Sequence, residues 1–249
     1  MTAGRAVCAA VAAALASLSL AACETTQETS SRLAAGAKDV AKEHGLKIGR
    51  ENRSIAVTGS SVLRDANGVA AVVLLRNSGP AQAGVPIAIA LRDAKGRDLY
   101  RNDLAGLDGS LTTIAVVPAR GRTFWVNDQI QAAAAPRRAT AKVGTARRAP
   151  SGPLPRMDLR RVAFEHDSDG VFARGIVENR SKLVQRRLVI SCISRRGDRI
   201  LAAGRAIVDR LPPAPTPKPA SFRVYFIGNP KGGGLSCTAP PTVLPGGSS

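Results

Sequence analysis

The residue types that most often carry out chemistry are scarce in this 249-residue chain, which has two histidines and four cysteines. His166 stands beside acidic and hydroxyl residues in His166-Asp167-Ser168-Asp169-Gly170. The members of a catalytic triad converge from separate elements, so consecutive residues cannot form one. The stretch also lacks the further acidic ligands and the distal glutamate of a calcium loop, and it is typical of a polar hairpin turn. We expect no catalytic residue, metal or cofactor, and hence no enzyme.

The N-terminus carries the strongest pattern in the chain. Arg5 precedes an uncharged apolar stretch that runs from Ala6 to about Leu20. This stretch is shorter than the run of about 20 apolar residues that a membrane-spanning helix needs, and it is typical of the apolar region of a secretory signal. The polar residues 24–31 that follow are typical of a flexible tether. Residues 1–22 are therefore predicted to be a signal peptide.

The end of that signal, Leu20-Ala21-Ala22-Cys23, resembles the lipobox of bacterial lipoproteins. In that family the signal is cut before the cysteine, whose sulfur then carries a diacylglyceryl group. The resemblance implies that Cys23 is lipidated with diacylglycerol and palmitate. It also implies that the protein is extracytoplasmic and anchored to a bacterial membrane, because two or more acyl chains suffice for stable anchoring. The alternative is an ordinary signal peptide with Ala-x-Ala cleavage and an incidental cysteine.

The remaining cysteines allow one disulfide. Cys8 leaves with the signal and Cys23 carries the lipid, so that Cys192 and Cys237 remain, in a compartment where disulfides persist. Their bond would close a loop of 45 residues, which the chain-entropy account values at about 4 kcal/mol. The alternative is a pair of buried free thiols.

The chain is strongly basic, with 36 Lys and Arg against 18 Asp and Glu and a net charge of +18. The excess could steer the protein toward anionic wall polymer or anionic lipid. The densest stretch offers Arg137, Arg138, Arg147 and Arg148 as candidate contacts, and a solvated linker is the alternative interpretation. Nucleic acid is not an expected partner, because the basic residues are not interleaved with aromatic residues for base stacking.

From Leu46 onward, short apolar runs rich in β-branched residues alternate with turn sequences such as Asp65-Ala66-Asn67-Gly68. The pattern predicts seven strands in the first half of the mature chain: Arg53–Gly59, Val69–Asn77, Pro86–Asp93, Asp98–Asn102, Leu111–Val117, Thr123–Asp128 and Ala139–Val143. It predicts six in the second half: Leu159–His166, Val171–Glu178, Arg187–Ser194, Arg199–Val208, Ser221–Ile227 and Gly234–Thr238. Strands of this length and spacing predict an all-β fold of sandwiches.

The two halves look like copies of one unit. Landmark residues recur at offsets of 98 to 102 positions: Asn77 and Asn179, Gly96 and Gly197, Phe124 and Phe222. In this register Ile87, Ile89 and Leu91 fall on Leu188, Ile190 and Cys192, and the period-2 spacing points each trio inward. The later offset places Cys237 on Ala139.

The stretch Leu91-Arg92-Asp93-Ala94-Lys95-Gly96 resembles the Leu-Tyr-Asp-x-x-Gly hairpin of FxLYD-type β-sandwich domains, which are immunoglobulin-like and extracytoplasmic. Arg92 stands where tyrosine is usual, and the second copy, Cys192 to Gly197, departs further. The resemblance implies two tandem sandwiches in a cell-envelope setting and no catalytic residues. The expected organisation is a signal peptide (1–22), a lipidated tether with a short helix (23–45), two sandwiches (46–145 and 158–245), a linker between them (146–157) and a tail (246–249).

A contact surface is expected on the first sandwich. The stretch from Asn102 to Gly109, with Asp103 and Asp108, is longer than a hairpin needs, and long loops often carry function. Trp125 follows Phe124, so alternation exposes one aromatic as a possible binding hot spot, unless loop residues cover the tryptophan. We therefore expect a non-catalytic interaction or scaffold protein that docks another envelope protein. The alternative is a binder of anionic wall polymer or lipid through the basic linker.

Overall fold

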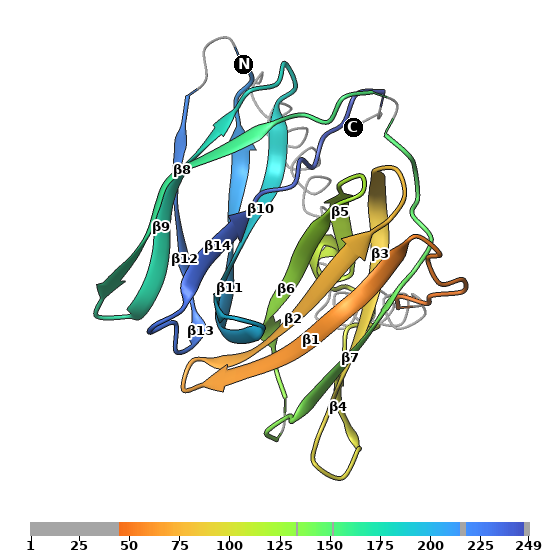
Figure 1. Ribbon diagram of the computed structural model, residues 1–249, viewed down its shortest axis with the longest axis vertical. Helices are drawn as coiled ribbons and strands as arrows, with labels where there is room; N and C mark the ends of the chain where they lie inside the picture. The colour runs from red at the N-terminus through yellow and green to blue at the C-terminus, as the bar shows by residue number, and fades with distance from the viewer. Residues whose placement is uncertain (1–44, 133, 151, 215–217, 247–249) are drawn as a thin grey trace, which may run out of the picture. The chain divides into compact units, whose positions relative to one another are not determined.

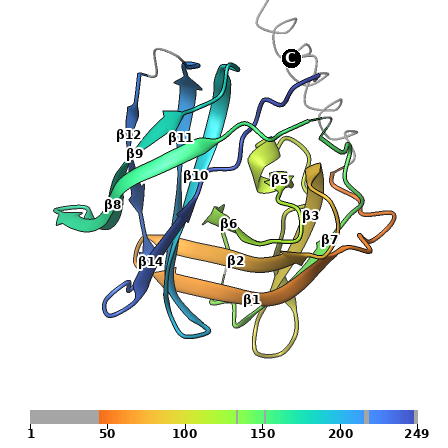
Figure 2. The ribbon, with the colours of Figure 1, turned by 45° about the horizontal axis from the view of Figure 1, so that its top comes forward.

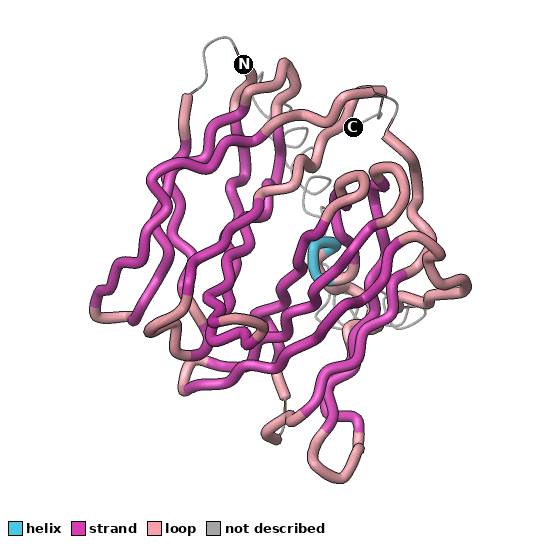
Figure 3. Tube along the Cα trace, viewed as in Figure 1, coloured by secondary structure: helices cyan, strands magenta, loops and turns pink. Residues whose placement is uncertain are grey.

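The computed structural model describes residues 45–132, 134–150, 152–214 and 218–246, and these belong to one compact unit. Cys23, its tether and the expected helix as far as residue 44 lie outside the described residues. The fold is all-β, as predicted, with antiparallel strands and one short 3-10 turn in the described part (Figures 1 and 3). Within those ranges, no helix is long and apolar enough to cross a membrane.

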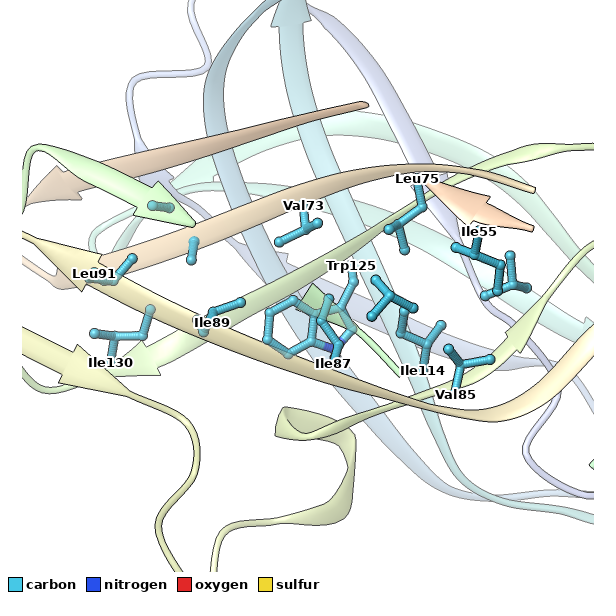
Figure 4. Packing of buried hydrophobic residues seen from close by; sticks show 14 of the residues in the cluster. Ile55, Val73, Leu75, Val85, Ile87, Ile89, Leu91, Ile114, Trp125 and Ile130 are labelled. Carbon is cyan, nitrogen blue, oxygen red and sulfur yellow. The ribbon is translucent and has the colours of Figure 1, made fainter. Parts of the chain in front are cut away.

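The first sandwich packs two sheets face to face. Its elements are β1 (Ile55–Asp65), β2 (Gly68–Asn77), β3 (Gln82–Arg92), β4 (Asp98–Arg101), the 3-10 turn (Gly109–Leu111), β5 (Thr113–Val117), β6 (Arg122–Ile130) and β7 (Arg138–Val143). One sheet has the order β1-β2-β6, and the other the order β4-β3-β5, with β7 also paired to β3. Alternate residues of β3, among them Ile87, Ile89 and Leu91, point into the core between them (Figure 4).

The second sandwich repeats this plan. Its strands are β8 (Met157–Asp167), β9 (Gly170–Asn179), β10 (Gln185–Arg196), β11 (Arg199–Leu211), β12 (Ala220–Tyr225), β13 (Ile227–Gly228) and β14 (Gly234–Thr238). The sheets have the orders β12-β9-β8 and β13-β11-β10-β14. Leu188, Ile190 and Cys192 are fully buried in its core, which confirms the inward direction predicted for them.

The disulfide between Cys192 and Cys237 is present, as predicted. Cys192 on β10 stands directly opposite Cys237 on β14. In the first sandwich, Leu91 on β3 stands opposite Ala139 on β7. The alignment of the two halves therefore places equivalent residues at equivalent positions, and the second copy carries a covalent link where the first copy has an apolar contact.

A buried asparagine closes the same corner in each copy. Asn77 donates from Nδ2 to the carbonyls of Pro80 and Pro118, at 2.7 and 2.9 Å. Asn179 donates to the carbonyl of Leu183 at 2.7 Å. Each side chain also accepts from the backbone N–H two residues later, so these carboxamides satisfy backbone groups that the corner would otherwise leave unpaired.

The outer face of sheet β1-β2-β6 packs against the second sandwich (Figure 2). Leu63, Ala70, Val72 and Val126 of the first sandwich are in one buried cluster with residues of β10, β11 and β13. The partners from the second sandwich are Ile193, Ile200, Ala203 and Ile227. We call this contact the sandwich interface. Strand β2 is consequently buried on both faces, which explains its unbroken apolar run.

Two carboxylates of the first sandwich complete the sandwich interface. Asp65 accepts from the backbone N–H of Gly228 at 2.7 Å. Asp128 accepts from both the backbone N–H and the Nε of Arg205, at 2.8 and 3.0 Å. The Arg205 side chain is only 3% exposed. Each carboxylate thus pairs with a backbone donor of the opposite sandwich, which fixes the register of the two sheets.

Every predicted strand overlaps an observed one, and the main differences arise at the sandwich interface. β1 continues to Asp65, well beyond the predicted end at Gly59. Val62 of this extension packs on the first core and Leu63 on the interface, so both faces of the segment are used. In the second sandwich β11 is continuous, whereas the first sandwich interrupts the corresponding edge between β4 and β5.

Replacing Cys192 and Cys237 together by alanine is expected to lower the free energy of unfolding by up to about 4 kcal/mol, because the 45-residue loop gains freedom in the unfolded chain. Urea unfolding of both proteins under oxidising and under reducing conditions measures the change in the free energy of unfolding. Reductant should shift the midpoint of the wild type and leave the double variant unmoved. Equal midpoints for the oxidised wild type and the variant would contradict a stabilising bond.

Asp128→Ala is expected to lower the free energy of unfolding by about 3 kcal/mol, because it leaves the buried Arg205 guanidinium without its counter-charge. The same substitution in an Arg205→Met background should cost less than about 1 kcal/mol, since no charge is then left unpaired. Asp98→Ala, which breaks an exposed pair with Arg92, is the matched control. Equal costs for Asp128→Ala and Asp98→Ala would show that the Asp128 pair does not hold the interface.

Candidate functional site

The structure places Trp125 in the core of the first sandwich. Its side chain lies among Ile87, Ile89 and Ile114 (Figure 4), and the residue is 6% exposed. The indole Nε1 donates to the carbonyl of Ser110 at 3.0 Å. Trp125 is therefore buried in the core and is not exposed as a hot spot.

The two aspartates of the long loop have different partners. Asp103 accepts from Arg101 Nε of its own sandwich at 2.7 Å. Asp108 precedes the 3-10 turn, where its side chain accepts from the backbone N–H of Ser110 at 2.9 Å. Its other oxygen pairs with Arg187 of the second sandwich. The loop that was expected to contact a partner thus makes an intramolecular contact through Asp108.

The four candidate arginines do not gather in one place. Arg137 and Arg138 lie at the start of β7, whereas Arg147 and Arg148 follow its end. The six residues of the strand span about 20 Å. All four are exposed, but the backbone of Arg147 and Arg148 is hydrogen-bonded to Gly84 and Ala83 on β3. These arginines therefore form two separate pairs.

An aromatic and charged surface lies on the second sandwich, where no contact surface was expected. We call it the outer face; it consists of Glu165 and Asp167 on β8, Phe172 and Arg174 on β9, and Arg223 and Tyr225 on β12, and Phe172 itself is only 2% exposed. Tyr225 stands opposite Phe172 and Arg223 opposite Arg174 across the β9–β12 ladder. The inward neighbours Phe222 and Val224 are buried in the second core, so Arg223 and Tyr225 point outward.

Contacts among its own side chains fix the conformation of the outer face. Tyr225 is 39% exposed, and its ring lies 5.2 Å from that of Phe172. The Arg223 guanidinium lies 5.1 Å from the Phe172 ring centre, a cation–π distance. Tyr225 donates its hydroxyl to Asp167 at 2.8 Å; this hydrogen bond raises the pKa of Tyr225 and lowers the pKa of Asp167.

The alternation of residue types along β12 is a sequence signal for this face. In Phe222-Arg223-Val224-Tyr225 the apolar residues alternate with an arginine and a tyrosine. Period-2 alternation alone places Arg223 and Tyr225 on the solvent side of a strand whose other side is buried. The same alternation holds for Phe124 and Trp125, but there the sandwich interface partly covers Phe124 on the outer side.

A cavity of about 390 Å³ opens between the two sandwiches, and we call it the junction cavity. One wall consists of the 3-10 turn, β5 and β6, and the other of residues from β10 and β11. Thr238, Pro240 and Thr242, at and after the end of β14, also line it. Trp125, Ile114 and Ile207 line it, together with Asp108 and several arginines. β5 and β6 are terminal strands of their sheets in the described part of the chain.

The surroundings of Asp108 in this cavity lower the pKa of its carboxyl group. The hydrogen bond from Ser110 is the first cause that lowers the pKa of Asp108, and the neighbouring Arg187 lowers it further. Both effects favour the charged carboxylate. Asp108 is therefore ionised at neutral pH and neutralises one of the guanidinium groups of the cavity.

The stretch from His166 to Gly170 forms a hairpin turn at the end of β8. Asp167 and Gly170 bound the turn between β8 and β9, where Asp167 accepts from the N–H of Asp169 at 3.0 Å. Over the described ranges, no group of three or more His, Cys, Asp and Glu side chains could hold a metal ion.

Neither the comparison with protein-family models nor the comparison with curated proteins gave a match for this chain.

Asp108→Asn is expected to lower the free energy of unfolding by about 0.5 kcal/mol at pH 7, because its pair with Arg187 is largely exposed. The pKa of Asp108 is lower in the folded than in the unfolded chain, so its contribution is present above the unfolded value of about 4 and is lost as the pH falls through the folded value. Urea unfolding at pH 7 and pH 2.5 measures this. A difference between wild type and variant that persists at pH 2.5 would contradict a charge effect.

Proposed function

We propose that this chain is a lipid-anchored protein of the bacterial cell envelope and a non-catalytic interaction or scaffold module for another envelope protein. The sequence Leu20-Ala21-Ala22-Cys23 supports the anchor, with Cys23 as the lipidated residue. The resemblance to FxLYD-type sandwiches supports the same extracytoplasmic setting. The observation that carries the docking role is the outer face of β8, β9 and β12.

The composition of the outer face suits a protein partner. Tyrosine and arginine are the residue types that most often dominate binding energy at protein interfaces. The chain has only two tyrosines, and Tyr225 stands exposed on this face beside Arg223 and Arg174. The carboxylates Asp167 and Glu165 pair with these arginines, so the face presents both charges and suits a mixed polar surface.

The face is also preorganised. The Tyr225 hydroxyl is bonded to Asp167 and the Arg223 guanidinium covers Phe172, so both side chains have already lost part of their freedom before a partner binds. Association costs about 0.5 to 1.5 kcal/mol for each flexible side chain that it immobilises, and preorganisation reduces that cost. The strands beneath this face are joined through the second core to β10 and β11, which the interface fixes to the first sandwich.

A photo-crosslinking amino acid at Ser221, an exposed position two residues before Arg223 on β12, is expected to capture one protein partner in intact cells. Tyr225→Ala in the same chain should reduce the adduct at least fivefold, because it removes the central aromatic contact. The crosslinker at Arg64, which is exposed on β1 of the first sandwich, is the matched control. Cys23→Ala should release the protein from the membrane fraction and abolish the adduct.

An adduct from Arg64 and none from Ser221 would place docking elsewhere and contradict the proposal. A Cys23→Ala protein that remains equally membrane-bound would contradict the anchor. Recovery of anionic wall polymer or lipid in place of a protein, reversed by high salt, would instead assign the role to the basic residues between Arg137 and Arg148.

A further inference from the structure

The junction cavity has the size and position of a small-molecule site. Its volume of about 390 Å³ lies within the usual range of about 300 to 1,000 Å³ for such sites, which occur preferentially where domains meet. Its apolar lining includes Ile114, Ala115, Phe124, Val189 and Ile207. This site is separate from the outer face, which lies on β8, β9 and β12.

The cavity is positively charged. Arg147, Arg186, Arg187 and Arg205 line it, against a single lining carboxylate, Asp108. Arg187 pairs with Asp108, and Arg205 pairs with Asp128. The guanidinium groups of Arg147 and Arg186 have no acidic partner among the described residues, so these two exposed cations remain to pair with a ligand.

Arg147 is held at the cavity by the backbone of β3. Its N–H donates to the carbonyl of Gly84 at 3.2 Å, and its aliphatic stem packs where Gly84 has no side chain. A Cβ at Gly84 would lie 3.3 Å from the Cβ of Arg147, and the backbone φ of +62° at Gly84 also favours glycine. Gly84 therefore makes room for Arg147 at the rim.

On the facing wall, Arg187 on β10 has a left-handed backbone conformation, as Gly84 on β3 does. Arg187 has a φ of 48°, a left-handed conformation that costs a non-glycine residue roughly 1 kcal/mol or more. Strained residues of this kind cluster at ligand clamps. The strain accompanies the pairing of Arg187 with Asp108 and lies next to the unpaired Arg186.

We propose that the junction cavity binds a single-chain acyl anion, with the apolar chain inside and a carboxylate or phosphate head between Arg147 and Arg186. Charge complementarity selects an anionic head, because a cationic head would face four guanidinium groups and one carboxylate. Seven Ser and Thr residues also line the cavity, but the larger part of its lining is apolar, and a hydrocarbon body gains from burial against Phe124, Val189 and Ile207. The volume suits one chain of moderate length rather than the two long chains of a membrane phospholipid.

The test uses three ten-carbon probes that differ only in the charge of the head: decanoate, decanol and decyltrimethylammonium. The protein is the mature chain with Cys23→Ser, a change outside the described residues. Trp125 is among the lining residues, but its ring lies in the first core, so isothermal titration calorimetry measures binding. Decanoate is expected to bind at pH 7.5 and low salt with one molecule per chain, at least tenfold more tightly than decanol, and the cation not to bind.

The double variant Arg147→Gln/Arg186→Gln should weaken decanoate binding about tenfold or more, the effect of losing charge-assisted hydrogen bonds, and leave decanol binding unchanged. Arg64→Gln/Arg199→Gln, which removes the same charge from exposed positions that do not line the cavity, is the matched control. Ala115→Leu should weaken all probes by filling the cavity. Thermal unfolding of each variant shows that it is folded.

Equal affinities for decanoate and decanol, or equal losses in the two double variants, would overturn the proposal. Binding of phosphatidylglycerol vesicles, or of a ten-residue glutamate peptide, without binding of decanoate would also overturn it, by assigning the arginines to a membrane surface or to a peptide. None of these outcomes bears on the crosslink at Ser221.

Discussion

The sandwich interface is the contact on which the rest of the described structure depends. It buries Val72 and Val126 of one sandwich against Ile193 and Ala203 of the other, and Asp65 and Asp128 bond to backbone donors on the far side. An apolar centre provides most of the stabilisation, since burial of such side chains is favourable by about 25 cal/mol per Å². The two partly buried carboxylates fix the orientation of the sandwiches, because leaving their partners unpaired there is costly. Two β-sandwiches that could each form a core thereby become one unit.

Divergence between the two copies creates the features with functional interest. The second copy keeps β11 continuous, whereas the first leaves the sheet after β4 and returns at β5. That departure carries Asp108 and Ser110, which reach Arg187 and Arg205 of the other sandwich and form one side of the junction cavity. The second copy also carries the disulfide where the first has Leu91 against Ala139. Both copies share the same strand plan, and the two candidate sites arise where the copies differ. The junction cavity depends on the interrupted edge of the first sandwich. The outer face depends on the pair Phe172 and Tyr225 of the second sandwich.

Period-2 alternation acts over a few residues, so it was enough to predict the strands and the inward trios. The Cys192–Cys237 bond was predicted because the other two cysteines were assigned to the signal and the lipid. The interface was not predicted. Asp128 and Arg205 are 77 residues apart and nothing local links them. The unbroken apolar run from Val69 to Leu75 was the available signal, since a strand with one solvent face would alternate. Among the described residues, Tyr225 is an exposed aromatic, whereas Trp125 is buried in the first core and Phe124 packs against the interface.

Differential scanning calorimetry of the mature chain with Cys23→Ser tests most directly whether the two sandwiches form one unit. The interface predicts a single endotherm in which the calorimetric enthalpy equals the van 't Hoff enthalpy, because neither sandwich unfolds without exposing Val72, Val126 and Ile193. Two separable transitions, each with the enthalpy of one sandwich, would contradict this account. They would show that the sandwiches unfold as two independent modules joined by a linker.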